Sequence, residues 1–203
     1  MPRPDLVLAS TSIYRRELLA RLRLPFRVVP PEVDETPMEG EPPAALARRL
    51  ALAKADAVAA QEPAAWVVGS DQVASADGRE AIGKPGGHAA AVAQLRAASG
   101  RELCFHTAVA LVNRRAGFSA CELTETRVRF RRLDDATIER YLRLEPAYDC
   151  AGAARSEALG IALVERIRDD DPSALVGLPL VALCSLLARA GMPVLGEAWD
   201  ASR

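Results

Sequence analysis

Apolar segments that alternate with helical patterns constrain this chain more than any other feature of its sequence. Short runs suited to buried strands occupy residues 5–9, 26–29 and 66–70, and amphipathic or alanine-rich helical patterns follow them. Two longer apolar runs, 103–113 and 118–131, are separated by a short polar segment, which is typical of a hairpin. Such alternation predicts helices packed on a sheet, and the hairpin adds antiparallel strands. We therefore predict an α/β or α+β fold in which helices flank a mixed sheet.

The remaining patterns complete the predicted order of elements. A helix is expected to follow Ser12, and Asp134 or Asp135 is expected to cap another helix, because Ser and Asp are both favoured at helix N-termini. The other predicted elements are helices at 44–60 and 88–98, a strand at 161–167 and a last helix after Pro179.

The charge balance excludes several classes of protein. The chain has 203 residues, of which 50% are hydrophobic, and its formal net charge is −1. This is enough apolar chain for a hydrophobic core and too little positive charge for a nucleic-acid coat, so we expect no nucleic-acid partner. No opening segment resembles a signal peptide, and no apolar run approaches the roughly 20 residues needed to span a bilayer. We therefore expect no membrane partner and a cytoplasmic location.

The cysteines carry no sign of a metal-binding motif. The chain lacks a C-x-x-C pair and has two histidines, whereas a zinc site needs Cys and His at ligand spacing, so the sequence disfavours zinc. His106 lies on an apolar strand and is expected to be a packed, hydrogen-bonded core residue. The four cysteines are expected to be small buried side chains in a reducing compartment: Cys104, Cys121, Cys150 and Cys184.

The start of the first predicted helix has an unusual charge. A strand passes into this helix through Ser10, Thr11 and Ser12, so free backbone N–H groups gather where the helix dipole is positive. Arg15 and Arg16 follow in the same first turn, where cations are unfavourable unless an anion is present. The pattern fits a phosphate cradle that contains Ser10, Ser12 and both arginines, and it also fits a solvated helix start.

Carboxylates occur at two other places that could face this helix start. One is the acidic segment 32–36, which by itself is typical of a solvated surface. The other is Asp71, which follows the apolar strand at 66–70 and is expected at its carboxyl end, where open α/β sheets bind ligands. Together with the basic helix start, these groups would form a metal and phosphate site.

Lysine is rare in this chain. Of 26 basic residues, only Lys54 and Lys84 are lysine, and the rest are arginine. Lys54 lies on the alanine-rich helical segment, where a surface position would be unremarkable. Lys84 lies in a Gly-Lys-Pro loop, and a compact ammonium suits a point contact to phosphate.

Missing motifs narrow the chemistry further. The sequence has no P-loop, no G-x-G-x-x-G dinucleotide motif and no G-x-S-x-G nucleophile elbow. Because neither a histidine nor a cysteine is placed for nucleophilic catalysis, carboxylate chemistry and metal-activated water remain. These points indicate hydrolysis of a phosphoryl or phosphoanhydride bond.

Six short motifs follow one another along the chain. They are Leu8-Ala-Ser-Thr-Ser12 with Arg15-Arg16, Val33-Asp-Glu35, Lys54-Ala55, Gly69-Ser-Asp-Gln-Val73, Gly83-Lys-Pro85 and Val176-Gly-Leu-Pro-Leu180. As an ordered set, from near residue 5 to near residue 190, they resemble the Maf family of nucleoside triphosphate pyrophosphatases. The resemblance implies a curved mixed sheet of the inosine-triphosphatase-like kind, one domain over residues 1–203 with two lobes around a central cleft, and a homodimer.

The resemblance also implies an activity and a set of site residues. The substrate is a nucleoside triphosphate, which is cleaved to the monophosphate and pyrophosphate with a divalent cation, Mg²⁺ or Mn²⁺. Asp71 is the proton acceptor, and Glu35 joins Asp71 in the metal site, with Asp34 as a further candidate. The residues implied for the triphosphate are Ser10, Ser12, Arg15, Arg16, Lys54 and Lys84.

Three positions resemble the branch of the family that acts on 7-methyl-GTP and removes this modified nucleotide. They are Tyr14, Gln72 and Glu157, of which Tyr14 replaces the usual Trp. An aromatic face can stack on the cationic methylated base, and a carboxylate can accept hydrogen bonds from its N–H edge. The alternatives are a dTTP/UTP-type or broad-specificity pyrophosphatase, and a non-catalytic nucleotide-binding regulator of cell division.

Overall fold

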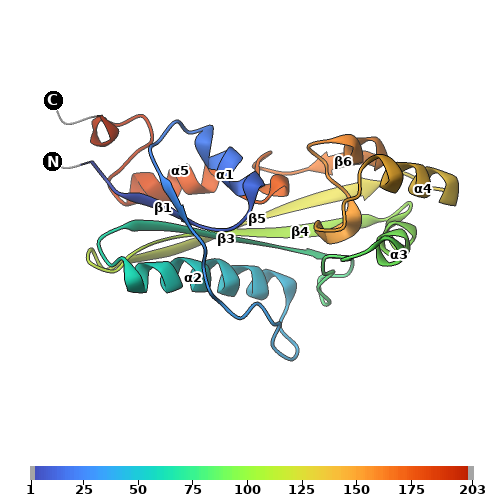
Figure 1. Ribbon diagram of the computed structural model, residues 1–203, viewed down its shortest axis with the longest axis horizontal. Helices are drawn as coiled ribbons and strands as arrows, with labels where there is room; N and C mark the ends of the chain where they lie inside the picture. The colour runs from blue at the N-terminus through green and yellow to red at the C-terminus, as the bar shows by residue number, and fades with distance from the viewer. Residues whose placement is uncertain (1–2, 201–203) are drawn as a thin grey trace.

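Six strands form one mixed β-sheet in the computed structural model, which describes residues 3–200 (Figure 1). Their order across the sheet is β2-β1-β3-β4-β5-β6. The strands are β1 (Leu6–Ala9), β2 (Arg27–Val29), β3 (Trp66–Ser75), β4 (Glu102–Asn113), β5 (Phe118–Phe130) and β6 (Val164–Arg168). β1 is parallel to both β2 and β3, whereas β3, β4, β5 and β6 pair antiparallel. The predicted α/β class with a mixed sheet flanked by helices is therefore confirmed.

Helices cover both faces of this sheet. In Figure 1, α2 lies along one face, and α1 and α5 lie on the other. α3 and α4 lie at the end of the sheet where β4 and β5 extend beyond β1. None of the helices within residues 3–200 is long and apolar enough to cross a membrane. The helices are α1 (Ile13–Ala20), α2 (Pro43–Gln61), α3 (His88–Ala98), α4 (Asp135–Leu144) and α5 (Leu180–Arg189).

The alanines of α2 allow this helix to approach the sheet very closely. Ala51 and Ala55 are fully buried against Gly69 of β3. A Cβ atom at Gly69 would lie 2.2 Å from the carbonyl oxygen of Ala51, so only glycine fits there. The close contact fixes α2, and with it Lys54, at a set height above β3.

Two predicted strands have different bounds from those expected. β3 continues to Ser75, five residues beyond the apolar run, because β4 pairs with it along that whole length. The strand predicted at 161–167 begins at Val164, and Leu159–Leu163 form a 3₁₀ helix. In both places pairing with a neighbouring strand decided the bounds, and apolar periodicity did not reveal it.

Candidate active site

A cleft opens beside β3 because β1 ends before β3 does. β1 pairs with β3 only as far as Ala9 and Gly69, so β3 has no partner from β1 beyond that point. The cleft has a volume of about 650 Å³ and is lined by residues of β3, α1, α2 and the loop at 81–84. Pockets for small ligands usually have about 300–1,000 Å³. Asp71 was predicted at the end of β3, but it lies in the middle of this strand, just beyond the point where β1 ends, and it lines the cleft.

Lys54 joins the two carboxylates of the cleft. Its Nζ atom lies 2.6 Å from Oδ1 of Asp71 and 2.7 Å from Oε1 of Glu35. Lys54 is 4% exposed and Asp71 is 7% exposed, so this pair is shielded from water. The lysine is not a surface residue of α2, and its ammonium offsets the repulsion between the two carboxylates.

Glu35 comes from a loop that is tied to α2. Burial by itself would raise the pKa of Glu35, but the hydrogen bond from Lys54 and the charges of Lys54, Lys84 and Arg15 hold this pKa below its ordinary value. Arg49 of α2 pairs with Glu41 at 2.7 Å and also donates to the carbonyl of Thr36. These contacts hold the segment that carries Glu35. The neighbouring Asp34 is exposed and accepts a hydrogen bond from the backbone N–H of Thr36.

Arg15 reaches into the cleft from the first turn of α1. Its Nε donates to the carbonyl of Gly177 at 3.0 Å, and its Nη2 lies 4.0 Å from Oδ1 of Asp71. Burial lowers the pKa of Arg15, and the negative charges of Asp71 and Glu35 partly counter this effect. The guanidinium is thus oriented by a backbone carbonyl.

The serines before α1 shape the start of this helix. Ser12 caps α1, and its Oγ accepts a hydrogen bond from the N–H of Arg15. Ser10 is buried and accepts a hydrogen bond from the N–H of Ser12 at 3.0 Å. Ser10 and Ser12 both line the cleft, as the cradle hypothesis predicts.

The other two predicted phosphate contacts differ in position. Lys84 is exposed on its loop but lines the cleft, and its charge acts on Glu35. Arg16 is exposed, does not line the cleft and forms no ion pair with any residue in 3–200. One side chain of the arginine pair therefore reaches the cleft and the other faces outward, because consecutive helical residues point about 100° apart.

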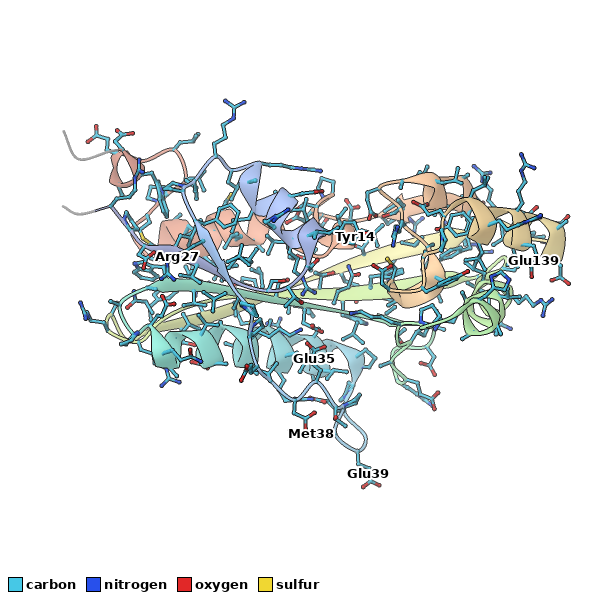
Figure 2. All side chains as sticks on the ribbon, viewed as in Figure 1. Tyr14, Arg27, Glu35, Met38, Glu39 and Glu139 are labelled. Atoms are coloured by element: carbon cyan, nitrogen blue, oxygen red, sulfur yellow. The ribbon has the colours of Figure 1, made fainter. Side chains whose placement is uncertain are left out.

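Tyr14 and Gln72 lie where the cleft meets a second, smaller cavity. This cavity has about 60 Å³ and is also lined by Glu157, so the structure brings together the three positions predicted for the base. Figure 2 shows Tyr14 at the start of α1 and Glu35 near α2, on opposite sides of the sheet seen edge-on. Gln72 donates hydrogen bonds to Thr107 Oγ1 and to two carbonyls of residues 174–175, so it holds this turn against β3.

Arg155 already places a cation against Tyr14. Its guanidinium carbon lies 5.7 Å from the centre of the Tyr14 ring, within the range of a cation–π contact. Asp149 holds the same guanidinium at 2.6 Å. The Tyr14 ring is therefore already paired with one cation, whose charge Asp149 offsets.

Two further residues, Ser70 and Asp171, support the site from behind and were not among its predicted residues. Ser70 donates to the carbonyl of Gly177 at 2.9 Å, and so fixes the same oxygen that orients Arg15. Asp171 is 3% exposed and accepts hydrogen bonds from Ser173 and from the N-terminus of α5. The acidic run 169–171 resembles a solvated turn, so only the fold distinguishes Asp171 from its exposed neighbours.

These features define an α/β protein whose ligand site lies beside the carboxyl end of a parallel strand, with cations and carboxylates facing one cleft. Residues 5–190 match the profile of the family described as Maf-like protein, and the chain belongs to this family.

Relatives of nearly equal length accompany the family match. A protein of Albidiferax ferrireducens named 7-methyl-GTP pyrophosphatase is 59% identical over 94% of this chain and 96% of its own. A protein of the same name from Cupriavidus metallidurans is 53% identical over 96% and 97% of the two chains. The solved structure of the Staphylococcus aureus Ham1 protein covers 62% of this chain and 71% of its own, with 14% identity and a TM-score of 0.46. This weak likeness adds nothing to the family assignment.

Proposed function

We propose that this chain is a nucleoside triphosphate pyrophosphatase that hydrolyses 7-methyl-GTP to 7-methyl-GMP and pyrophosphate. The observation that carries the proposal is the buried contact of Lys54 with Asp71, which Glu35 joins from the exposed side, beside Arg15, in a cleft large enough for a nucleotide. The names of the two relatives support the same reaction and the same substrate.

The cations of the cleft bind the triphosphate. Arg15 and Lys84 approach from different elements, and Ser10 and Ser12 add polar groups at the start of α1. Lysine and arginine next to phosphate oxygens neutralise the charge that develops on the leaving pyrophosphate. Arg16 is also assigned to the triphosphate, and it would have to turn toward the cleft when substrate binds.

The two carboxylates fit a divalent cation. Asp71 and Glu35 already reach the same ammonium nitrogen, so one cation can contact both, and carboxylate oxygens are the ligands that Mg²⁺ and Mn²⁺ prefer. When bound there, either ion supplies Lewis-acid polarisation of the phosphate. Lys54 keeps both carboxylates in place within the cleft.

Asp71 acts as the general base. A water molecule attacks the α-phosphorus, and its proton passes to the carboxylate of Asp71. The bond between the α-phosphorus and the oxygen that bridges to the β-phosphate breaks, and pyrophosphate leaves. The hydrogen bond from Lys54 orients the carboxylate for this transfer.

Tyr14 and Glu157 select the base. Tyr14 lies at the junction of the cleft and the smaller cavity, and Arg155 shows that its ring accepts a cation as neighbour. The methylated guanine is itself cationic, and Glu157 can accept its N–H groups. Gln72 positions the turn at 174–175 behind this base site.

We extend the proposal to the organisation of the protein. The single sheet that joins all six strands supports one domain over residues 1–203, with α2 and the base-site elements as the two sides of the cleft. A cytoplasmic location and a homodimer complete the proposal, and they rest on the family resemblance.

Pyrophosphate release from a series of nucleoside triphosphates, with Mg²⁺, with Mn²⁺ and without metal, tests the reaction. We expect release from 7-methyl-GTP to exceed release from GTP, UTP and dTTP. Asp71→Asn should abolish turnover and leave the thermal midpoint measurable, whereas the control Asp170→Asn, an exposed carboxylate, should leave turnover unchanged. Near-wild-type turnover by Asp71→Asn would refute the role of this residue, and no release from any substrate would favour a nucleotide-binding regulator.

The base assignment has its own test. Tyr14→Ala combined with Glu157→Gln should reduce kcat/KM for 7-methyl-GTP far more than for UTP. Glu165→Gln, an exposed carboxylate on β6, is the matched control and should change neither value. Equal losses on both substrates in the double variant would mean that these two side chains do not set the base preference.

A further inference from the structure

Cys104, His106 and Glu125 gather on the same face of the sheet as Asp71, on the neighbouring strands β4 and β5. Cys104 and His106 lie two residues apart on β4, so both point to the same face, and Glu125 of β5 lies directly opposite His106. The sulfur, a ring nitrogen and a carboxylate oxygen all lie within 4.8 Å of one another. No sequence motif indicates this cluster, because the pairing of β4 with β5 brings Glu125 to the other two residues.

His106 supplies an unused ligand atom at the centre of this cluster. The residue is 8% exposed, and its Nδ1 atom is buried without a hydrogen-bond partner among residues 3–200. The nearest carboxylate oxygen, Oε2 of Glu125, is 3.9 Å away, which is too far for a hydrogen bond. A buried nitrogen without a partner is costly in a folded protein, so its environment requires explanation. The expectation of a packed residue is correct, but the expected hydrogen bond is missing at Nδ1.

We propose that Cys104, His106 and Glu125 form a second metal site, which takes a divalent ion of the zinc class and a water molecule as fourth ligand. Open zinc sites have three protein donors, drawn from Cys sulfur, His nitrogen and carboxylate oxygen, and a water molecule as fourth ligand. Bonds from zinc to these atoms are about 2.0–2.3 Å long, so small side-chain rotations bring all three donors to one ion. On binding, the thiol of Cys104 gives up its proton to solvent, and the thiolate becomes the ligand.

The surroundings of Glu125 support this assignment. Arg127 donates to Oε1 of Glu125 at 2.8 Å, which leaves Oε2 turned toward His106. Ligating carboxylates are commonly oriented by such a second hydrogen bond. The side chain of Glu125 is 43% exposed, so an ion can enter from solvent.

The cluster differs from the Asp71 centre in both place and chemistry. Asp71 pairs with Ala108 of β4, and His106 lies two residues before Ala108 on that strand, opposite Val73. The cluster therefore begins on the strand next to Asp71, displaced by two residues. Asp71 and Glu35 offer only oxygen atoms, which suit Mg²⁺ or Mn²⁺, whereas thiolate and imidazole select zinc-like ions. An ion at the cluster would connect β4 and β5 and stabilise the folded chain.

Titration of the metal-free full-length chain with Co²⁺ tests the proposal. A cobalt ion bound to thiolate has a charge-transfer band in the near ultraviolet, and an ion bound only to oxygen at Asp71 lacks this band. We expect the band to grow to one equivalent, to vanish when Zn²⁺ displaces Co²⁺, and to be absent in Cys104→Ser. His106→Gln and Glu125→Gln should weaken binding at least about tenfold.

Matched variants make the result specific. Cys121→Ser removes a half-buried thiol of β5 outside the cluster, and Asp71→Asn removes a ligand of the other centre, so both should keep the band. Zn²⁺ should also raise the thermal midpoint of the wild type and not that of Cys104→Ser. The proposal would be overturned by the absence of the band in the wild type, by a band that survives in Cys104→Ser, or by a band lost in Cys121→Ser. The wild-type spectrum decides even if a variant fails to fold.

Discussion

Replacement of Gly69 by alanine should show how strongly the packing of α2 sets the geometry of the site. The added Cβ would lie 2.2 Å from the carbonyl oxygen of Ala51 and 2.7 Å from the backbone nitrogen of Ala55. An ordinary contact begins at 3.4 Å, so α2 must move away from β3 by about 1.2 Å. Both contacted atoms belong to a helix backbone, which cannot turn aside as a side chain can.

The expected cost lies at the upper end of the range for overpacked cores, about 3 kcal/mol. For a chain of this size, each kcal/mol lowers the thermal midpoint by about 2–4 °C, so Gly69→Ala should lower it by about 6–12 °C. The same movement lengthens the 2.6 Å contact between Lys54 and Asp71. Misplacement of a catalytic group by about 1 Å costs about 100-fold in rate, and we expect pyrophosphate release to fall by that factor.

Calorimetry and a pyrophosphate-release assay on the same preparation check both values. Gly83→Ala is the control for stability, because a Cβ at Gly83 meets nothing within 4 Å and the residue does not have a left-handed backbone. Its thermal midpoint should stay within about 2 °C of the wild type. Wild-type stability and wild-type turnover in Gly69→Ala would refute the idea that direct backbone contact at this position holds Lys54 in place.

Four further changes test other parts of the structure. Asp171→Ala leaves several donors of the α5 start without an acceptor, so calorimetry should show a loss of about 3 kcal/mol, whereas a loss under 1 kcal/mol would contradict a structural role. Arg49→Ala frees the loop that carries Glu35, and amide exchange at 34–41, followed by mass spectrometry, should become faster; unchanged exchange would contradict the tether. The pKa of Glu35 is lowered in the folded chain, so its stabilising contribution is complete above the ordinary pKa of 4.5 and is lost as the pH falls through the lowered value. The urea midpoint of Glu35→Gln should therefore fall less than that of the wild type between about pH 6 and about pH 3. Lys84→Arg keeps the charge but changes the shape of the cation, so pyrophosphate release should fall at an unchanged thermal midpoint, and full activity would show that lysine itself is not required.

The local patterns of the sequence predicted most of the elements. The helix at 88–98 has the predicted bounds, and Asp134 caps α4 as expected, because caps and apolar spacing act within one or two turns. The mixed sheet followed from the alternation of strands and helices together with the hairpin at 103–131. The ordered motifs placed Ser10, Arg15, Lys54, Asp71 and Lys84 in one site, and all five line the cleft.

The contacts within that site depend on residues far apart in the chain. Lys54 and Glu35 are separated by the start of α2, and nothing in the local sequence indicates that one ammonium contacts both Glu35 and Asp71. The same is true of the carbonyl of Gly177, which Arg15 and Ser70 share across more than a hundred residues.

What the sequence alone determined is thus the set of chemical groups and the elements that carry them, since propensity, capping and apolar periodicity are local properties. The tertiary structure decided which of these groups meet. It ended β1 at Ala9, so that Asp71 lines the cleft from the middle of β3. It also turned Arg15 toward the cleft and Arg16 toward solvent, and it brought Glu125 to Cys104 and His106. The physical reason is that strand pairing and the packing of α2 on Gly69 are contacts between separate segments, and the pattern of one segment does not show which side chains of the other it will meet.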